Sequence, residues 1–262
     1  MEFFDWKLDI DHPVSVLNIA VEQVRSNLQL DIHSALHLLI LNGGSHRGRC
    51  GNAEMTMLPG EIFVSAPWEP HCSLPGGKKE MLVINIDPDA LKNFFFAGYD
   101  RIERLLVMPP LKRFAYLNKL PEKSVYIANL NKLAVMPEDG AKNLYIWHTV
   151  LALLMACDPP CEINSGSIAD SRRFINALQR LGKEPLPVEE AARVCNLSAS
   201  RFAALFKASF GVSFGRYERI FRLNGAAEAL RRGATLKEAA AEWGFCDKSH
   251  LARLLGRKMI DK

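Results

Sequence analysis

Apolar and polar positions change their spacing along the first 160 residues of the chain. Between about residues 35 and 86, short apolar runs are separated by turn-forming pairs such as Gly43-Gly44 and Pro59-Gly60. Short strands with such punctuation are typical of an antiparallel sandwich or a small barrel. We expect strands at residues 35–41, 53–57, 61–65 and 81–86.

After Pro88 the apolar residues recur every three or four positions, which predicts helices at 89–96, 121–135 and 139–156. The last of these carries a stripe made of Leu144, Trp147, His148, Leu151, Leu154 and Met155. Such a stripe packs either in a core or against a second copy of the chain, and the sequence leaves both readings open. In the second reading, a homodimer forms through Leu144, Trp147, Leu151 and Leu154.

A domain boundary is expected at residues 158–167, because these ten positions hold two prolines, a glycine and several polar residues. Proline and glycine at this density interrupt a helix. The predicted organisation begins with a sensor or dimerisation domain at 1–157, which has a barrel at about 30–88 and helices at about 89–157. A linker at 158–167 follows, and then a helical domain at 168–262.

The helical domain contains an internal repeat, because residues 192–198 are echoed 48 positions later by residues 240–246. In each copy an alanine precedes by four positions a residue that tolerates positive φ, Asn196 or Gly244. A tight turn between two closely crossing helices requires this combination. Ser198 and Asp247 follow at positions where they can cap the second helix of each copy. The pattern predicts two helix-turn-helix units.

Each second helix is amphipathic and presents small polar or basic side chains, as readout of the DNA major groove requires. The predicted DNA-binding residues are Ser200, Arg201, Ala203, Ala204 and Lys207 in the first unit, and Lys248, Ser249, His250, Arg253 and Arg257 in the second. A long helix at 213–232 joins the units. Its Arg216, Arg219 and Arg222 are either phosphate contacts or a solvated face.

The distribution of charge follows the same division. Residues 167–262 hold 18 Lys and Arg against 10 Asp and Glu, a balance of +8, whereas residues 1–166 hold 15 against 19, a balance of −4. A basic domain behind an acidic one is typical of a nucleic-acid-binding domain joined to a non-binding one. The acidic first five residues and the absence of an apolar run of eighteen residues favour a cytoplasmic location without a membrane span.

Residues 197–214 resemble the first recognition unit of AraC/XylS-type transcription regulators. The similarity continues through Tyr217, Arg222-Leu223, Ala226, Ala229-Leu230 and residues 243–253, and residues 58–71 are similar to the cupin-like sensor segment of such regulators. The resemblance implies an α+β protein. A cupin-like antiparallel β-barrel or sandwich followed by helices precedes an all-α domain, whose two helix-turn-helix units are joined by a long helix.

The function implied is that of a sequence-specific DNA-binding transcription regulator, controlled by a small-molecule effector or by dimerisation through the N-terminal domain. Its expected partners are double-stranded DNA and, for an activator, RNA polymerase. We expect no enzyme activity, no catalytic residues and no cofactor. Two alternatives remain: a degenerate regulator that acts through protein contacts, and a cupin enzyme with an appended helical domain.

The sequence departs from the family pattern in the recognition helices. Ala203 and Ala204 stand where a long polar residue and an arginine are common, and alanine can touch a thymine methyl but cannot donate to guanine. Gly256 replaces a usual basic residue inside a helix, at a cost of about 1 kcal/mol. The chain also stops at Lys262, before the final helix of the family. We expect weak readout by the first unit and a weakened second unit.

Candidate ligand-binding residues in the barrel segment are polar or aromatic, and each of them could equally be a core or rim residue. They are His37, Arg49, Trp68, Glu69, His71 and Asn85. Metal-binding cupins use an HxH pair, whereas His71 has no such partner and His46 stands alone. The six cysteines form no CxxC pair, which favours reduced thiols. We therefore expect no metal.

Overall fold

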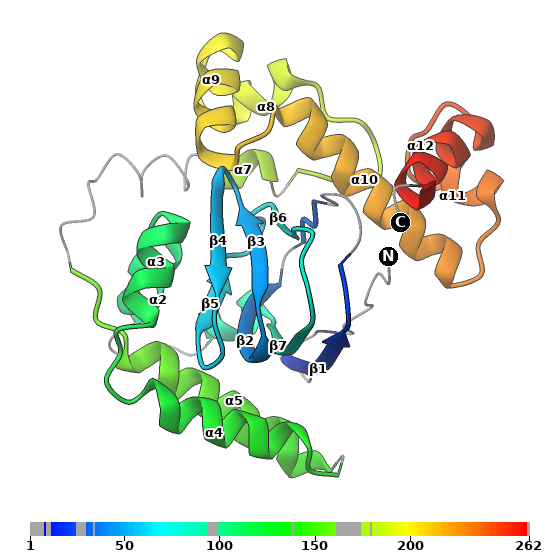
Figure 1. Cartoon of the computed structure of the whole chain (residues 1–262). Coiled ribbons are helices and arrows are strands. Elements are labelled where there is room, and N and C mark those ends of the chain that lie inside the picture. Colours follow the sequence, from blue (N-terminus) through cyan, green and yellow to red (C-terminus); the bar gives the residue numbers. More distant parts are fainter. Residues whose placement is uncertain are drawn as a thin grey trace.

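The computed structural model describes residues 8, 12–24, 30–33, 35–93, 99–137, 139–160, 174–178 and 180–260. Figure 1 shows two β-sheets at the centre, with helices from the middle of the chain beside them and the C-terminal helices across one end. This architecture confirms the predicted order of an antiparallel β domain, a set of helices and an all-helical domain. Within the described residues, every helix is too short or too polar to cross a lipid bilayer.

Neighbouring strands in both sheets are antiparallel. The larger sheet has the strand order β1 (Val14–Val21), β7 (Lys79–Ile86), β2 (Leu36–Gly44) and β5 (Ile62–Ser65). The smaller has the order β4 (Ala53–Met57), β3 (His46–Cys50) and β6 (His71–Ser73). Four of these strands were predicted. Strand β1 extends the sheet on the N-terminal side of the expected barrel, and β3 and β6 were also not expected.

Alternation along the central strands divides the core of this domain into two layers. In β2, Leu36, Leu38 and Ile40 point to the face that packs against helices, whereas Leu41 points between the two sheets. The adjacent β7 does the same with Ile84 on the helix side. Because side chains alternate across a strand, a strand buried on both faces becomes apolar along its whole length. This explains why β2 and β7 read as continuous apolar runs.

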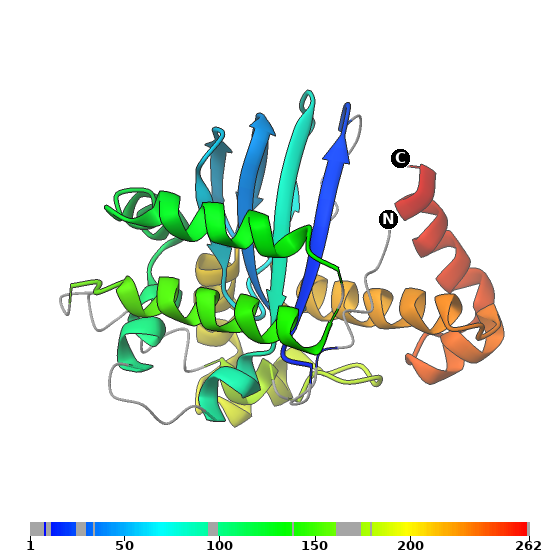
Figure 2. The same cartoon turned by 90° about the horizontal axis from the view of Figure 1, so that it is seen from below.

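The described residues in the middle of the chain form helices around the larger sheet. They are α1 (Pro88–Asn93), α2 (Tyr99–Val107), α3 (Pro110–Leu117), α4 (Lys123–Ala134) and α5 (Gly140–Ala156). Helices α4 and α5 lie over its outer face and α3 lies along its β5 edge. Figure 2 shows α4 and α5 lying across this sheet. The predicted helices at 121–135 and 139–156 are confirmed. The predicted helix at 89–96 is shorter, and its last positions lie outside the described residues.

The apolar stripe of α5 belongs mainly to the core. Trp147 and Leu154 are 3% and 0% exposed and pack with the sheet and neighbouring helices, and Leu151 lies partly buried against the same cluster. Leu144, in contrast, is 53% exposed. A dimer seam through all four residues is therefore wrong, because two of its members already lie inside this molecule.

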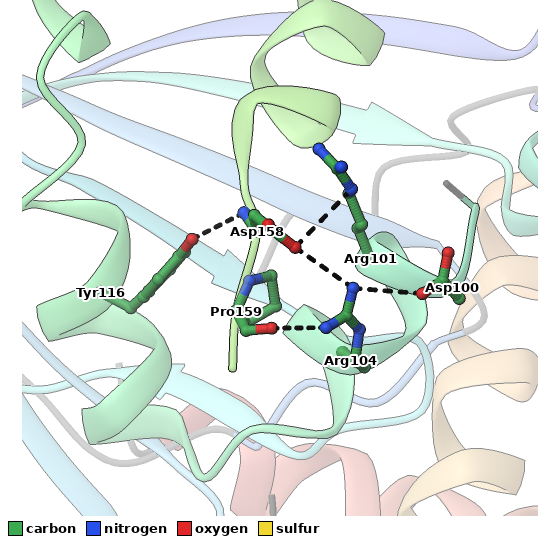
Figure 3. A network of polar contacts seen from close by, with 6 residues as sticks. All are labelled: Asp100, Arg101, Arg104, Tyr116, Asp158 and Pro159. Atoms are coloured by element: carbon green, nitrogen blue, oxygen red, sulfur yellow. Dashed lines mark hydrogen bonds and ion pairs between the residues drawn. The ribbon is translucent and has the colours of Figure 1, made fainter. Parts of the chain in front are cut away.

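The start of the predicted linker is tied to the sensor domain. The Asp158 carboxylate lies 3.2 Å from Arg104 and 3.6 Å from Arg101, and the Pro159 carbonyl accepts a hydrogen bond of 2.7 Å from Arg104 (Figure 3). The Tyr116 hydroxyl lies 2.7 Å from the Asp158 amide and accepts its hydrogen bond. Asp158 and Pro159 therefore belong structurally to the N-terminal domain. The rest of the predicted linker lies outside the described residues.

The C-terminal domain consists of helices in the predicted arrangement. They are α7 (Ile175–Leu178), α8 (Val188–Val194), α9 (Ala199–Phe210), α10 (Phe214–Arg231), α11 (Leu236–Glu242) and α12 (Lys248–Ile260). Helices α8 and α9 form the first unit, α11 and α12 the second, and α10 is the predicted connector. In Figures 1 and 2 the second unit lies at the end of α10 that is remote from the first.

Candidate nucleic-acid interface

Both helix-turn-helix turns have the backbone conformation that the repeat predicts. Asn196 has φ of 54° and Gly244 has φ of 62°. The alanines four positions earlier, Ala192 and Ala240, are buried at the helix crossings. A Cβ atom at position 244 would lie 2.9 Å from the Lys183 carbonyl oxygen, so this turn requires glycine for space as well as for conformation.

The predicted N-caps are also present. The Ser198 hydroxyl accepts a hydrogen bond of 3.3 Å from the Arg201 amide at the start of α9. At the start of α12, Asp247 Oδ1 accepts one of 2.7 Å from the His250 amide. This hydrogen bond lowers the pKa of Asp247, which stays charged at the positive end of the helix dipole. Each cap orders the helical turn from which DNA contacts are expected.

Helix α9 turns its aromatic residues inward. Phe202, Phe206 and Phe210 are buried, and the Phe206 ring packs edge-on against Phe174 and Phe214, with ring centroids 5.2 Å apart in both pairs. The opposite face is exposed. It carries all five predicted contact residues of this unit, Ser200, Arg201, Ala203, Ala204 and Lys207. The first unit thus presents one free, mildly basic face.

Helix α12 is arranged in the same way around buried Leu251. Lys248, Ser249 and Arg253 are exposed, whereas His250 is half-buried with its ring 6.1 Å from Phe245. Arg257 lies on the same helix, but its side chain is outside the described residues. The second unit therefore has a more basic exposed face than the first.

The three arginines of α10 have different environments. Arg216 and Arg219 are exposed. Arg222 is buried, forms an ion pair with Glu218, and donates hydrogen bonds of 3.0 Å to the carbonyls of Trp243 and Gly244. The predicted phosphate contact by Arg222 is therefore wrong, because its guanidinium is already used to hold the turn of the second unit against α10.

The six predicted effector residues do not converge on one cavity. A hollow between the two sheets, with about 350 Å³ of empty volume partly open to solvent, includes Arg49 and His71 in its lining. His37 and Asn85 are buried in the larger sheet. Glu69 pairs with the fully buried Arg113 and accepts a hydrogen bond of 2.9 Å from the Ala66 amide, so its carboxylate has a structural role.

The sixth residue, Trp68, lies in the joint between the two domains. Its ring is 5.5 Å from the Phe221 ring of α10, and its carbonyl accepts a hydrogen bond of 2.7 Å from the buried Tyr217 hydroxyl. Ile32 of the sensor domain, 2% exposed, packs into the aromatic core of the first unit. The sensor domain thus contributes directly to the core on which α9 rests.

A second hollow lies beside this joint, with about 550 Å³ of empty volume that includes open solvent. Arg49, Asn52 and Glu54 line it from the N-terminal domain, and Gly211 and Arg216 line it from the C-terminal domain. Arg49 is paired with Glu54 at 2.5 Å. A molecule in this hollow would touch both domains at once.

The structure also assembles a group that the sequence analysis did not anticipate. His33, His37 and His71 have one ring nitrogen each within 4.8 Å of the other two. The sequence analysis considered only the HxH spacing, which His71 lacks, and therefore did not find these two spatial neighbours. The H-x₃-H spacing of His33 and His37 was the available signal, because residues four apart in extended chain lie on the same face.

Comparisons with known proteins agree with this architecture. Residues 191–259 match a family model described as a helix-turn-helix domain. A search of curated protein sequences finds no match for this chain. Among solved structures, ToxT from Vibrio cholerae with a bound unsaturated fatty acid is similar over 94% of this chain and 91% of its own, with 12% identity and a TM-score of 0.54. An apo form of ToxT with a single substitution, from the same organism, is similar over 93% of both chains, with 13% identity and a TM-score of 0.51.

Proposed function

We propose that this chain is a sequence-specific DNA-binding transcription regulator of the AraC type, because residues 191–259 match a helix-turn-helix domain model. The observation that carries the proposal is the repeated unit itself. Two capped helices, α9 and α12, follow turns of the same left-handed conformation and present exposed polar and basic side chains. Paired helices of this kind read two successive segments of the major groove.

The two recognition helices are proposed to contribute differently. In α12, Lys248, Ser249 and Arg253 supply hydrogen-bond donors to base edges and phosphates. In α9, Arg201 and Lys207 flank the methyl groups of two alanines, which suit contact with thymine. Arg216 and Arg219 of the connector are the proposed phosphate contacts. We assign the stronger base readout to the second unit.

Control by a small-molecule effector is part of the proposal. A ToxT structure of the same fold is described as bound to an unsaturated fatty acid. In this chain the hollow beside the joint has Arg216 on its wall, next to the ion pair of Arg49 and Glu54, and suits a polar molecule with one anionic group. The role proposed is regulatory rather than catalytic and is exercised in the cytoplasm, with RNA polymerase as a further partner of an activator.

The test is selection of random duplex DNA by the full-length protein, followed by a salt titration on the selected sequence. We expect a motif of two half-sites about one helical turn, or 10 base pairs, apart. Arg253→Ala should relax selection in one half-site and weaken binding by about 1–3 kcal/mol, and Arg201→Ala should affect the other half-site less. Arg47→Ala, an exposed arginine of the sensor domain, is the charge-matched control.

Unselective binding with a steep salt dependence would overturn sequence-specific regulation, because it reflects phosphate contacts alone. Absence of DNA binding would favour the alternative of a regulator that acts through protein contacts. Equal effects of Arg253→Ala and Arg47→Ala would contradict the assignment of α12 to the groove.

A further inference from the structure

The cluster of His33, His37 and His71 has a shape suited to a metal ion. His33 Nε2 and His71 Nε2 are 3.3 Å apart. The centroid of the His37 ring lies 4.1 Å from that of His33 and 4.9 Å from that of His71. A tetrahedral ion with bonds of about 2.0–2.1 Å holds its ligand nitrogens about 3.3 Å apart. The first pair already has this separation, and the third nitrogen lies within 4.8 Å of both.

One ligand is held in the tautomer that a metal needs. His71 Nδ1 lies 2.8 Å from the Glu69 carbonyl oxygen. A carbonyl oxygen only accepts, so Nδ1 carries a proton, and Nε2, on the side of His33, is the nitrogen left to bind a metal. The hydrogen bond from the outer ring nitrogen to a backbone carbonyl is the arrangement that commonly orients metal-binding histidines.

The other two rings are held inside the domain. His37 is 7% exposed and His33 is half-buried, and their ring centroids are 4.1 Å apart. The Asp31 carboxylate lies close enough to His37 to act on it electrostatically, and supplies negative charge beside the three rings.

We propose that His33, His37 and His71 bind a divalent transition-metal ion, and that this ion controls how the sensor domain holds the first DNA-binding unit. Three neutral imidazoles suit Zn²⁺, Cu²⁺, Ni²⁺ or Fe²⁺ and are poor ligands for Mg²⁺ or Ca²⁺. With three protein ligands, water or a small ligand completes the coordination of such an ion. The second half of the proposal rests on the proposed function.

The connection to DNA binding is short in sequence and in space. His33 directly follows Ile32, which packs into the aromatic core of the first unit. His71 stands three residues after Trp68, whose carbonyl and ring contact α10. The two ligand segments are joined by backbone hydrogen bonds: the Asp31 amide donates to the His71 carbonyl at 2.7 Å, and the Trp68 amide to the His33 carbonyl at 2.8 Å.

These contacts make the joint and the histidine cluster parts of one small assembly. Drawing three rings onto one ion requires movements of about 1.5 Å or less, from 4.8 to about 3.3 Å. Since His33 and His71 already have this separation, the movement falls mainly on His37 of β2. An ion that bridges His33 and His71 would fix the spacing between the segments that carry Ile32 and Trp68. The metal therefore acts on the surface that seats α9 and α10, and reaches the second unit only through α10.

The binding half is tested with Co²⁺ alone as the probe, on purified full-length protein without DNA. We expect one Co²⁺ per chain, with the intense visible absorption of low-coordinate cobalt. His33→Gln and His71→Gln should each weaken binding by at least about 100-fold. His148→Gln, an exposed histidine on α5, and Cys246→Ser, an exposed thiol, are the controls and should bind as the wild type does.

Far-ultraviolet circular dichroism identifies any variant that fails to fold, and the half-buried His33 provides a second test if His71→Gln is lost. Co²⁺ binding that persists in His33→Gln, or that disappears in Cys246→Ser, would overturn the assigned site. Binding no tighter than that of the doubly substituted His33→Gln, His71→Gln protein would do the same.

The regulatory half is tested by measuring the affinity for the selected DNA with and without Zn²⁺. We expect a change of at least about 5-fold in the wild type and none in His33→Gln. No change in the wild type would overturn metal control while leaving both DNA binding and the metal site in place. A chain that binds Co²⁺ through this cluster but binds no DNA would support the site and overturn the proposed function.

Discussion

The two helix-turn-helix units share a turn but not a core. Asn196 and Gly244 adopt the same left-handed conformation, and both second helices begin with a side-chain cap. The first unit is built around stacked and edge-on phenylalanine rings. The second has an alanine-rich core in which Phe245 is the buried aromatic residue. Local sequence determines the turn, whereas each core is free to differ.

The two units also differ in the residues outside each unit that pack against it. The first unit is completed by Ile32 and contacted by Trp68, both from the sensor domain. The second unit is held on α10 by the buried pair of Arg222 and Glu218 and by the Trp243 ring, which packs where Gly225 has no side chain. The N-terminal domain therefore contacts the first unit directly, and the second unit is connected to it through α10.

The largest expected effect comes from removing the buried arginine of the second unit. Arg222→Met leaves the Glu218 carboxylate buried without its partner and frees the carbonyls of Trp243 and Gly244. We expect a loss of about 3–5 kcal/mol in the free energy of unfolding, measured by urea denaturation. The control, Arg219→Met on the exposed face of α10, should change stability by less than about 0.5 kcal/mol and weaken the salt dependence of DNA binding. Equal losses in both variants would contradict the structural role of Arg222.

Two glycines of α10 allow the same substitution to be compared within one helix. A Cβ atom at position 225 would overlap the Trp243 ring, whereas one at position 215 meets nothing within 4 Å. Gly225→Ala should destabilise the second unit by about 3 kcal/mol, while Gly215→Ala should stabilise the helix by up to about 1 kcal/mol. Urea denaturation followed by tryptophan fluorescence measures both. Similar stabilities of the two variants would show that the second unit does not depend on this contact.

Acid should lower the free energy of unfolding of the N-terminal domain, because this domain contains the buried His46. Burial, and then the charge of Lys79, lowers the pKa of His46 from 6.5 to about 3. As the pH falls below 6.5, His46 becomes protonated in the unfolded chain but stays neutral in the folded chain. The contribution of this group to the free energy of unfolding is therefore fully present above pH 6.5 and declines toward pH 3. At pH 5 the loss from this group is about 2 kcal/mol.

The measurement is urea denaturation of the wild type and of His46→Gln at pH 7 and pH 5. The fall in unfolding free energy between these pH values should be about 2 kcal/mol smaller in the variant. An identical fall in both proteins would mean that His46 titrates normally in the folded state.

The smallest expected effect comes from the hydrogen bond across the joint. Tyr217→Phe removes the hydroxyl that donates to the Trp68 carbonyl at 2.7 Å but keeps the buried ring. We expect a loss of about 1 kcal/mol in stability and faster amide hydrogen exchange around residues 66–71. Base readout by α12 should be unchanged. A changed preference at the half-site of the second unit would contradict the separation of the two supports.

The features that could be predicted from the sequence are those made by neighbours along the chain. The Ser198 and Asp247 caps and the turns at Asn196 and Gly244 depend on residues within a few positions, so local pattern is sufficient. Strands β2 and β7 were visible because burial on both faces made their central positions, residues 38–41 and 81–84, continuously apolar. Strand β3 was missed, because its buried positions are His46, Gly48 and Cys50, which do not form an apolar alternation.

The features that could not be predicted depend on distant partners. Arg222 recurs with Arg216 and Arg219 every third position, and only the carbonyls of the turn 21 and 22 residues later distinguish it from them. His33 and His71 are 38 positions apart and meet because residues 31 and 71 pair in the fold. The stripe on α5 was ambiguous for the same reason, since periodicity identifies an apolar face and not what covers it.

Ile32 has a consequence for the order in which the molecule is made. Tyr217 is 149 positions after Trp68, and the aromatic core that receives Ile32 extends to the same helix. At about 5–20 residues per second, about 7–30 seconds of translation separate the two sides of this joint. During that interval the apolar surface around Ile32 is exposed, because the residues that cover it have not yet been synthesised. The first unit then folds onto a template that is already in place, whereas the second unit assembles on α10 from residues made within seconds of one another.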